Sequence, residues 1–306
     1  MGIGNAVQVS FIGVGMMGHG MAKNLVEKGF PTAVLGHRNR APVEDLIKRG
    51  AREASSPADA AANSEIVFLC VTGSPQVEEI VYGKNGLRGA AKRGQVIVDC
   101  STSEPSSTTR IREDFAKDGV AFVDAPLART PKEAELGKLN VMVGAEPEVF
   151  ARIEPALKAF AENIFHVGGP GSGHVMKLLN NFLAMGHAAL IAEVLVAGQK
   201  SGADLDQFYK VVSAGGANSG IFQMLVTNIL KGDDGGLPFL LRLALKDLTY
   251  YAHLNEGLDL PSPLGAAVLP ACDQASTLGY GDRLVGGLIR AQEQITGTKI
   301  KTGATG

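Results

Sequence analysis

The glycine-rich segment Gly13-Val14-Gly15-Met16-Met17-Gly18 directly follows an apolar, strand-like run from Val7 to Ile12. After a strand, the first glycine of a G-x-G-x-x-G pattern permits a tight turn. The second lets a pyrophosphate approach the backbone, and the third lets the next helix pack close to the sheet. The N-terminus of that helix attracts phosphate through its free amides and its dipole. We therefore predict that residues 13–18 bind a dinucleotide; the alternative is a purely structural glycine turn.

The residues after this turn complete half of a mononucleotide-binding unit, because a helical stretch up to Lys28 is followed by a strand-like run from Thr32 to Leu35. An acidic residue at the end of that strand would bind the ribose of NAD, whereas a basic residue would accept the extra phosphate of NADP. The strand end has no acid before Glu44 and reads Gly36-His37-Arg38-Asn39-Arg40. We predict NADP as the preferred cofactor and NAD as a second one, with Arg38, Asn39 and Arg40 near the 2'-phosphate. A solvated basic turn is the alternative.

Strand-like and helical runs alternate over residues 1–168, which predicts a Rossmann-type, doubly wound parallel sheet. The expected strands after the second are Ile66 to Val71, Val96 to Cys100, Ala121 to Asp124 and Leu139 to Val143. From residue 169 to 295 the apolar spacing is helical, so the second domain is expected to be all-α. Residues 296–306 form a polar tail, which we expect to be frayed.

Composition limits the classes of partner and compartment. A chain of 306 residues can bury a core for two domains, and its net charge of −2 gives no reason to expect nucleic acid or an anionic membrane as a partner. The three cysteines show no paired spacing and the histidines no metal-ligand spacing, so we expect reduced thiols in a cytoplasmic protein and no catalytic metal. The apolar stretch Leu178 to Val196 is interrupted by polar residues, which favours a helix buried in protein on most sides over a membrane span.

Residues just past the predicted strands are the next candidates, because a ligand of an open α/β sheet lies across the carboxyl ends of its strands. Their hydroxyls and amides can contact ribose, nicotinamide and substrate, although loop Ser and Thr also cap helices. The candidates are Val71 and Thr72 after one strand, as cofactor contacts, Ser101 after another, as a substrate contact with Thr102 beside it, and the segment from Asp124 to Thr130 after a third.

Lys177, Asn180 and Asn181 lie in the long apolar segment that starts after Gly173. Positions three and four apart share one face of a helix, so both amides lie beside the lysine, and Asn180 and Asn181 are candidate substrate-binding residues. Desolvation and the helix N-terminus both lower the pKa of a lysine in the first turns of an apolar helix. Lys177 is therefore a candidate proton donor or acceptor; the alternative is a lysine whose ammonium group reaches solvent at the helix start.

The sequence resembles the β-hydroxyacid dehydrogenase family over nearly its whole length. The similarity lies in the segments FIGVGMMGHGMAKNL, DCSTSEP, DAPLARTPKEAELGKLNVMVG, GSGHVMKLLNN and FLLRLALKDL, in this order. The resemblance implies a Rossmann-type domain, a long interdomain helix, a helical C-terminal domain, and assembly into homodimers or homotetramers. It also implies roles for single residues: Lys177 as the catalytic acid/base, Asn181 as the substrate orienter, Thr102 and Lys246 as cofactor contacts, and Phe239 and Asp247 as substrate-binding residues.

The reaction implied by this resemblance is hydride transfer between NADPH and a small semialdehyde or 3-hydroxy acid, as in 3-hydroxyisobutyrate dehydrogenases. One segment departs from the family, since Ala128-Arg129-Thr130 stands where Ser-Gly-Gly usually binds the substrate carboxylate. An arginine there can form a bidentate pair with a carboxylate, sulfonate or phosphate. We predict that Arg129 binds the substrate's acidic group, with Thr130 beside it, as the similar Arg-Thr pair of sulfolactaldehyde reductases suggests. The alternative is an arginine that points to solvent from a loop.

Two other functions are compatible with this architecture. Imine reductases share it but commonly replace the helix lysine, so the presence of Lys177 counts against that function. A non-catalytic module that senses a dinucleotide would need neither Lys177 nor Asn181 and Lys246.

Overall fold

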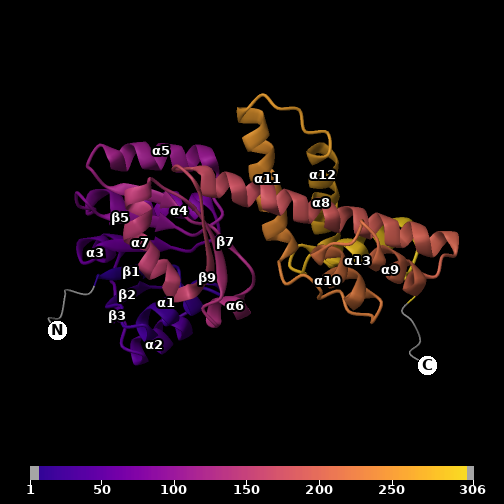
Figure 1. The fold of residues 1–306 in the computed structure, drawn as a ribbon, viewed down its shortest axis with the longest axis horizontal. Coiled ribbons are helices and arrows are strands. Elements are labelled where there is room, and N and C mark those ends of the chain that lie inside the picture. The colour runs from indigo at the N-terminus through magenta and orange to yellow at the C-terminus, as the bar shows by residue number, and fades with distance from the viewer. Residues whose placement is uncertain (1–6, 302–306) are drawn as a thin grey trace. The chain divides into compact units, whose positions relative to one another are not determined.

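The computed structural model describes residues 7–301. Contacts within the chain divide it into two compact units, of which one ends at Lys177 and the other begins at Leu178. The first unit is a sheet with helices on both faces, and the second is helical (Figure 1). Both parts agree with the predicted Rossmann-type and all-α halves.

The sheet of the first unit has nine strands in the order β3-β2-β1-β4-β5-β6-β8-β7, and β9 pairs with β8. The pairs from β3 to β6 are all parallel, as predicted. At the other edge β8 runs antiparallel to β6 and β7, a departure from the all-parallel pattern that strand composition does not signal. The strands are β1 (Val9–Ile12), β2 (Thr32–Leu35), β3 (Arg52–Glu53), β4 (Ile66–Leu69), β5 (Val96–Asp99), β6 (Ala121–Asp124), β7 (Leu127–Ala128), β8 (Leu139–Gly144) and β9 (Ala161–Gly168).

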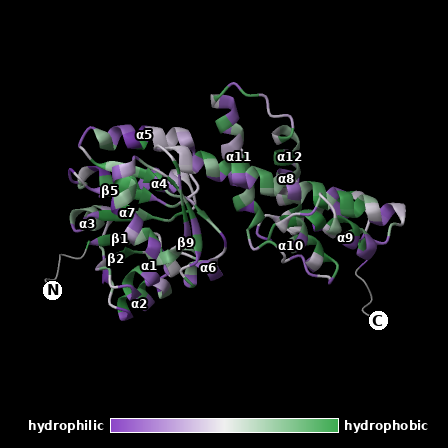
Figure 2. Ribbon diagram, in the orientation of Figure 1, coloured by the Kyte–Doolittle hydropathy of each residue, from purple (hydrophilic) through white to green (hydrophobic). Residues whose placement is uncertain are grey.

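Both faces of the sheet are buried, which explains why its strands are apolar at successive positions. Along β4, Ile66 and Phe68 belong to a core with α1, α2 and α7, whereas Val67 and Leu69 belong to a core with α3, α4 and α5. Figure 2 shows the resulting apolar strands between helices of mixed polarity. The helices are α1 (Gly18–Glu27), α2 (Ala41–Lys48), α3 (Pro57–Ala62), α4 (Ser74–Tyr82), α5 (Pro105–Ala116), α6 (Pro131–Glu135) and α7 (Pro147–Phe160), with a 3-10 turn η1 (Leu87–Gly89).

The second unit packs its helices around one apolar core, in which Leu195, Leu225, Leu241 and Cys272 are buried. α8 starts in the first unit and continues into the second. The helices are α8 (Ser172–Ser201), α9 (Leu205–Ala214), α10 (Gly220–Ile229), α11 (Leu241–Gly257), α12 (Gly265–Ala275) and α13 (Gly287–Thr296), with a short π-helix η2 (Ser276–Tyr280).

α8 is less buried than the sequence predicts. By length and composition it could cross a membrane, and only 33% of its most apolar 18-residue window is buried. Large side chains such as Leu183 and Leu190 are exposed along it. The prediction of a helix buried on most sides is therefore wrong, because the neighbouring helices of the chain cover one side of α8 and leave an apolar side uncovered.

The predicted frayed tail is also wrong for the residues that the structure describes. α13 ends at Gly297, which adopts the left-handed φ of +63°. Ile300 then returns to the core of the second unit, and its amide donates to Glu293 at 2.6 Å. The amide of Lys301 donates to Gln199 of α8 at 2.8 Å. Residues 302–306 lie outside the described part of the chain.

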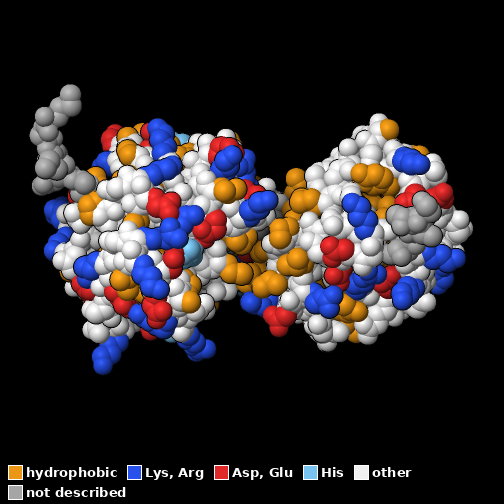
Figure 3. Space-filling model, turned by 90° about the horizontal axis from the view of Figure 1, so that it is seen from below, with side chains coloured by type: hydrophobic (Ala, Val, Ile, Leu, Met, Phe, Trp, Pro, Cys, Tyr) orange, Lys and Arg blue, Asp and Glu red, His pale blue; other side chains and the backbone are white. Residues whose placement is uncertain are grey.

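The three cysteines are unpaired. Burial raises the pKa of the Cys70 and Cys272 thiols to about 12 and that of Cys100 well above its ordinary value, so none has the properties of a reactive thiolate. On the face shown in Figure 3, basic and acidic side chains are interspersed rather than gathered by sign. This distribution fits the small net charge of −2.

Candidate active site

The glycine turn between β1 and α1 has the geometry that its sequence predicts. Gly13 adopts φ +96°, and a Cβ there would lie 2.3 Å from the carbonyl oxygen of Cys70. A Cβ on Gly18 would lie 2.0 Å from the carbonyl oxygen of Gly13. A Cβ on Gly15, in contrast, would have no atom within 4 Å. The outer two glycines are thus required by the fold, whereas the middle one faces open space and fits a phosphate group that approaches the backbone.

This turn lies at the point where the strand order of the sheet reverses. β1 is paired on one side with β2 and on the other with β4, in a register that aligns Ile12 with Leu69. Ligands of doubly wound sheets bind outside the carboxyl ends of the strands at such a point. Val71 and Thr72 follow β4 and Thr102 follows β5, so the structure brings these predicted cofactor contacts to the same edge as the glycine turn.

The basic loop after β2 is exposed, and its two arginines differ. Arg40 makes a bidentate ion pair with Glu53 of β3, at 2.7 and 3.0 Å, which holds the pKa of that carboxyl below its ordinary value. Arg38 has neither an ion pair nor a hydrogen bond to any other residue between 7 and 301. Asn39 accepts the amide of Ala41 at the start of α2, at 3.2 Å. Of the three predicted 2'-phosphate contacts, Arg38 is therefore the one whose side chain is not already held.

Ser101, predicted to bind substrate, is buried at the end of β5. Its hydroxyl oxygen accepts the amide of Val71 at 3.0 Å, and its own amide donates to Asp99 at 2.9 Å. The side chain of Ser101 thus joins the ends of β4 and β5. Its substrate contact stays a prediction.

Asp124, the last residue of β6, caps α8 from a distance of 47 residues in the sequence. Its carboxylate oxygens accept the amides of Gly171 at 2.6 Å and of His174 at 2.8 Å. This close approach requires glycine, because a Cβ on Gly173 would lie 2.6 Å from the carbonyl oxygen of Asp124. A carboxylate at a helix N-terminus also interacts favourably with the helix dipole. Sequence reasoning missed this cap, since only its position beside the sheet reveals it.

The position of Lys177 follows from this cap. Lys177 is half-buried in the second turn of α8, three residues after His174, and Asn181 lies four residues further along the helix. The cap therefore fixes the position of Lys177 at the carboxyl edge of the sheet, where the glycine turn also lies.

Arg129 does not point freely to solvent. It adopts φ +81°, a left-handed conformation that favours glycine, and its guanidinium donates to the carbonyl oxygen of Lys138 at 2.6 Å and to the carboxylate of Glu162. The guanidinium holds the pKa of Glu162 below its ordinary value. Arg129 is thus already engaged with a carboxylate at a partly exposed position. The hydroxyl and amide of Thr130, in turn, bind Glu133 in a capping box that starts α6.

In the second unit, the predicted residues of α8 and α11 form one polar cluster. The buried carboxylate of Asp247 accepts the Asn181 amide at 2.5 Å, and its other oxygen lies 2.8 Å from the ammonium of Lys246. Asn180 donates to the Asn181 side-chain oxygen at 3.1 Å. Asp247 therefore fixes the amide of Asn181 so that its oxygen faces Asn180. Phe239 is not part of these contacts and packs against the apolar core of the unit.

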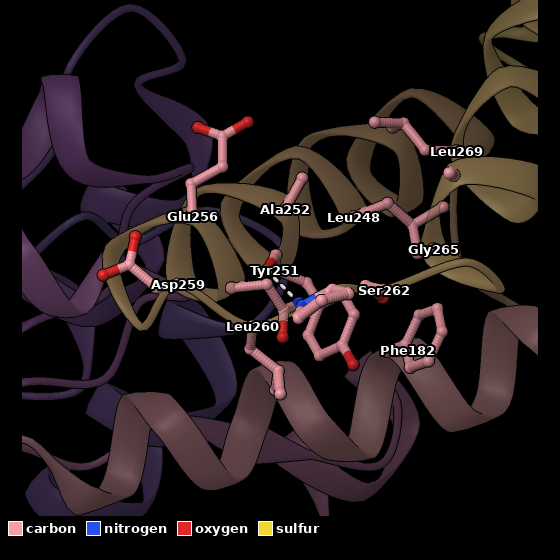
Figure 4. Close-up of a pocket in the computed structure, with 13 residues that line it drawn as sticks. Phe182, Leu248, Tyr251, Ala252, Glu256, Asp259, Leu260, Ser262, Gly265 and Leu269 are labelled. Carbon is pink, nitrogen blue, oxygen red and sulfur yellow. Dashed lines mark hydrogen bonds between the residues drawn. The ribbon is translucent and has the colours of Figure 1, made fainter.

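A cavity of about 590 Å³ lies in the second unit between α8, α11 and α12 (Figure 4). Phe182 of α8 stacks on Tyr251 of α11 at one wall, with ring centroids 4.0 Å apart, and Leu260 lies at the edge. None of the predicted catalytic, substrate-binding or cofactor-binding residues lines this cavity. Between residues 7 and 301, no three His, Cys, Asp or Glu side chains form a group that could hold a metal ion.

Comparison with known proteins identifies the family. Residues 8–168 match the NAD binding domain of 6-phosphogluconate dehydrogenase, and residues 171–291 match the NAD-binding domain of NADP-dependent 3-hydroxyisobutyrate dehydrogenase. The chain belongs to the β-hydroxyacid dehydrogenase family. Like other members of this family, it is an NAD(P)-dependent oxidoreductase that acts on a hydroxy acid or on the corresponding aldehyde.

Individual β-hydroxyacid dehydrogenases resemble the chain over almost its whole length. It is 31% identical over 298 residues to 2-(hydroxymethyl)glutarate dehydrogenase of Eubacterium barkeri, covering 97% of this chain and 99% of that protein. It is 32% identical to 3-sulfolactaldehyde reductase of Escherichia coli K12, over 89% and 91% of the two chains. A crystal structure of 3-hydroxyisobutyrate dehydrogenase from Salmonella typhimurium superimposes with a TM-score of 0.80 at 26% identity, over 93% and 99% of the chains.

Proposed function

We propose that the protein uses NADPH to reduce a small semialdehyde that carries a second, anionic group, and that it oxidises the matching 3-hydroxy acid in reverse. The proposal is based on the position of Lys177 in α8. Asp124 caps the first turn of this helix at the carboxyl edge of the sheet. The relatives named above support an acidic substrate, because their names specify a glutarate and a sulfonated aldehyde.

In the proposed mechanism, Lys177 moves the proton. When bound, the cofactor supplies a hydride to the carbonyl carbon of the substrate. Protonated Lys177 donates a proton to the oxygen that becomes an alkoxide, and in the oxidation neutral Lys177 removes that proton. Such acid-base help contributes roughly 10²–10⁴ in rate. Asn181, whose amide is fixed by Asp247, orients the substrate.

Replacement of Lys177 tests this mechanism. We expect Lys177→Ala to lower kcat by roughly 10²–10⁴, because the proton donor is lost, while the NADPH dissociation constant stays within about twofold. The measurement is NADPH consumption with succinic, methylmalonic and tartronic semialdehydes, glyoxylate and sulfolactaldehyde, with a cyclic imine in parallel. Near-normal turnover by the variant would refute the role of Lys177. Turnover of the imine alone would favour an imine reductase, and NADPH binding without any turnover would favour a sensor.

The preference for NADPH rests on Arg38, the arginine of the loop after β2 that is not held by a neighbouring carboxylate. We expect Arg38→Ala to weaken NADPH binding about tenfold and to leave NADH binding unchanged, since only NADPH carries the 2'-phosphate. Arg40→Ala is the matched variant, and its effect should be smaller because Glu53 already binds Arg40. Tighter binding of NADH than of NADPH by the unaltered protein would overturn the preference.

Arg129 is proposed to bind the anionic group of the substrate, which would replace Glu162 as the partner of the guanidinium. We expect Arg129→Gly to raise KM for the acidic substrate about 10- to 100-fold, because one charge-assisted pair is lost. Glycine suits the φ of +81°, so the thermal unfolding temperature should not fall. Glu162→Gln is the control: it keeps Arg129 and removes the competing carboxylate, so KM should fall or stay constant. An unaltered KM in Arg129→Gly would exclude this role.

A second copy of the chain is the partner that the surface of the second unit favours. Leu183 and Leu190 of α8 and Leu258, Leu260 and Leu264 of the loop after α11 are each between 55% and 72% exposed. At roughly 100 Å² of apolar surface per leucine, these side chains together expose about 300 Å², which is comparable to the largest apolar patch on a typical monomer, a feature that is often functional. Leu260 of this loop and Phe182, which precedes Leu183 in α8, line the same cavity (Figure 4). We propose that this patch, which presents both a helix face and a loop, pairs with its copy in a homodimer.

Light scattering coupled to size-exclusion chromatography tests the dimer. The unaltered protein should have twice the chain mass of 31.9 kDa, or a multiple of that dimer. Leu183→Glu and Leu264→Glu should each shift it to the monomer, because a carboxylate would be buried without a partner. Leu136→Glu, at an exposed leucine of the first unit, is the control and should leave the mass unchanged. A monomeric unaltered protein, or a dimer that survives either variant, would contradict the proposed surface.

A further inference from the structure

His174 is fully buried in the first turn of α8, and its polar groups reach three other parts of the first unit. Ring atom Nδ1 lies 2.7 Å from the hydroxyl of Thr108 in α5, and Nε2 lies 3.1 Å from the carbonyl oxygen of Ser101. The backbone amide donates to Asp124 at 2.8 Å. One residue therefore joins the start of α8 to α5, to the loop after β5 and to the end of β6.

The neighbours of the ring determine its orientation. The carbonyl oxygen of Ser101 only accepts hydrogen bonds, so Nε2 carries a proton; the nearest oxygen of Asp99 lies 3.7 Å from the same ring atom. At the other end of the ring, the Thr108 hydroxyl can bond to Nδ1 or to the carbonyl oxygen of Glu104 at 3.1 Å. An apolar side chain in place of His174 would leave the Ser101 carbonyl and the Thr108 hydroxyl without these bonds in a buried place, which is costly.

The loop held by His174 is the one from which a cofactor contact is predicted. Ser101 and Thr102 form the start of this loop, while Lys177 lies three residues after His174 on the same helix. Residues three apart lie on one face of a helix, so a shift or rotation of His174 moves Lys177 with it. A misplacement of about 1 Å between reacting groups can lower a rate roughly 10²-fold.

We propose that His174 is a positioning residue of the reaction: its ring holds the first turn of α8 against the loop after β5 and so sets the place of Lys177 relative to Thr102. The inference rests on the proposed function, in which Lys177 transfers the proton. Because His174 is fully buried, it acts through Lys177 and not on the substrate.

A merely structural role has a different signature from a positioning role. Loss of a structural hydrogen bond lowers the free energy of unfolding but leaves the rate of hydride transfer in the folded protein unchanged. Loss of a positioning bond lowers that rate while the cofactor still binds. The rate of NADPH oxidation in a single turnover, the NADPH dissociation constant and the unfolding temperature therefore separate the two roles.

Four variants make the comparison. His174→Leu removes both ring bonds, and Thr108→Val removes only the one to α5. His174→Gln keeps a side-chain donor and an acceptor. Ser107→Ala is the matched control, because Ser107 is buried next to Thr108 in α5 and donates to Glu78 at 2.6 Å, away from the ring.

We expect His174→Leu to slow hydride transfer about 10- to 100-fold with the NADPH dissociation constant within about twofold of normal. Thr108→Val should slow it less, and His174→Gln should recover most of the rate. Ser107→Ala should lower the unfolding temperature alone.

Normal single-turnover rates in His174→Leu and Thr108→Val, or equal rates in His174→Leu and His174→Gln, would overturn the inference. If His174→Leu does not fold, a normal rate in Thr108→Val overturns it and a slowed rate supports it. Failure of the proposed function gives a different result, because the unaltered protein would then turn over no substrate of the panel. That result would refute both the reductase function and the positioning role of His174.

Discussion

The carboxylate of Asp124 at the N-terminus of α8 is the contact on which the rest of the site depends. A buried carboxylate is costly unless its oxygens are hydrogen-bonded, and here the amides of Gly171 and His174 supply those bonds. The cap exists only because Gly173 has no side chain, since a Cβ would meet the backbone of β6. A helix of 30 residues is thereby attached at one end to a defined strand, and Lys177 is carried to a defined place.

The glycine turn likewise depends on a close backbone approach that only glycine permits. Gly13 and Gly18 let β1, α1 and the end of β4 approach more closely than any side chain would allow. Gly15 contributes nothing to that packing, and the space beside it is what a phosphate requires. Within one motif, Gly13 and Gly18 are therefore required for packing, and Gly15 leaves the space for the ligand. Arg129, in contrast, occupies a backbone conformation that suits glycine, and its guanidinium is bound by Lys138 and Glu162.

The sequence predicts features that are set by residues close together in the chain better than features that are set by contacts between distant residues. The buried strands and the glycine turn are local patterns, and β2 and β6 have the predicted bounds. The strands β3, β7 and β9 were not predicted, because β3 and β7 have only two residues each and the alternation in β9 is weak. The antiparallel direction of β8 is set by how the chain returns to the sheet. The tail was wrongly expected to fray because Ile300, an isolated apolar residue in a polar segment, finds a place in a distant core.

By itself, the sequence determined the class of fold, the dinucleotide turn and the pair Lys177 and Asn181 on one helix, because each depends on the spacing of residues close together in the chain. The tertiary structure decided what those residues contact. It placed Glu162 on Arg129, Glu53 on Arg40, Asp247 on Asn181 and Asp124 on the start of α8. The partners in these four pairs lie between 13 and 66 residues apart, so only the path of the folded chain brings their charges and amides together.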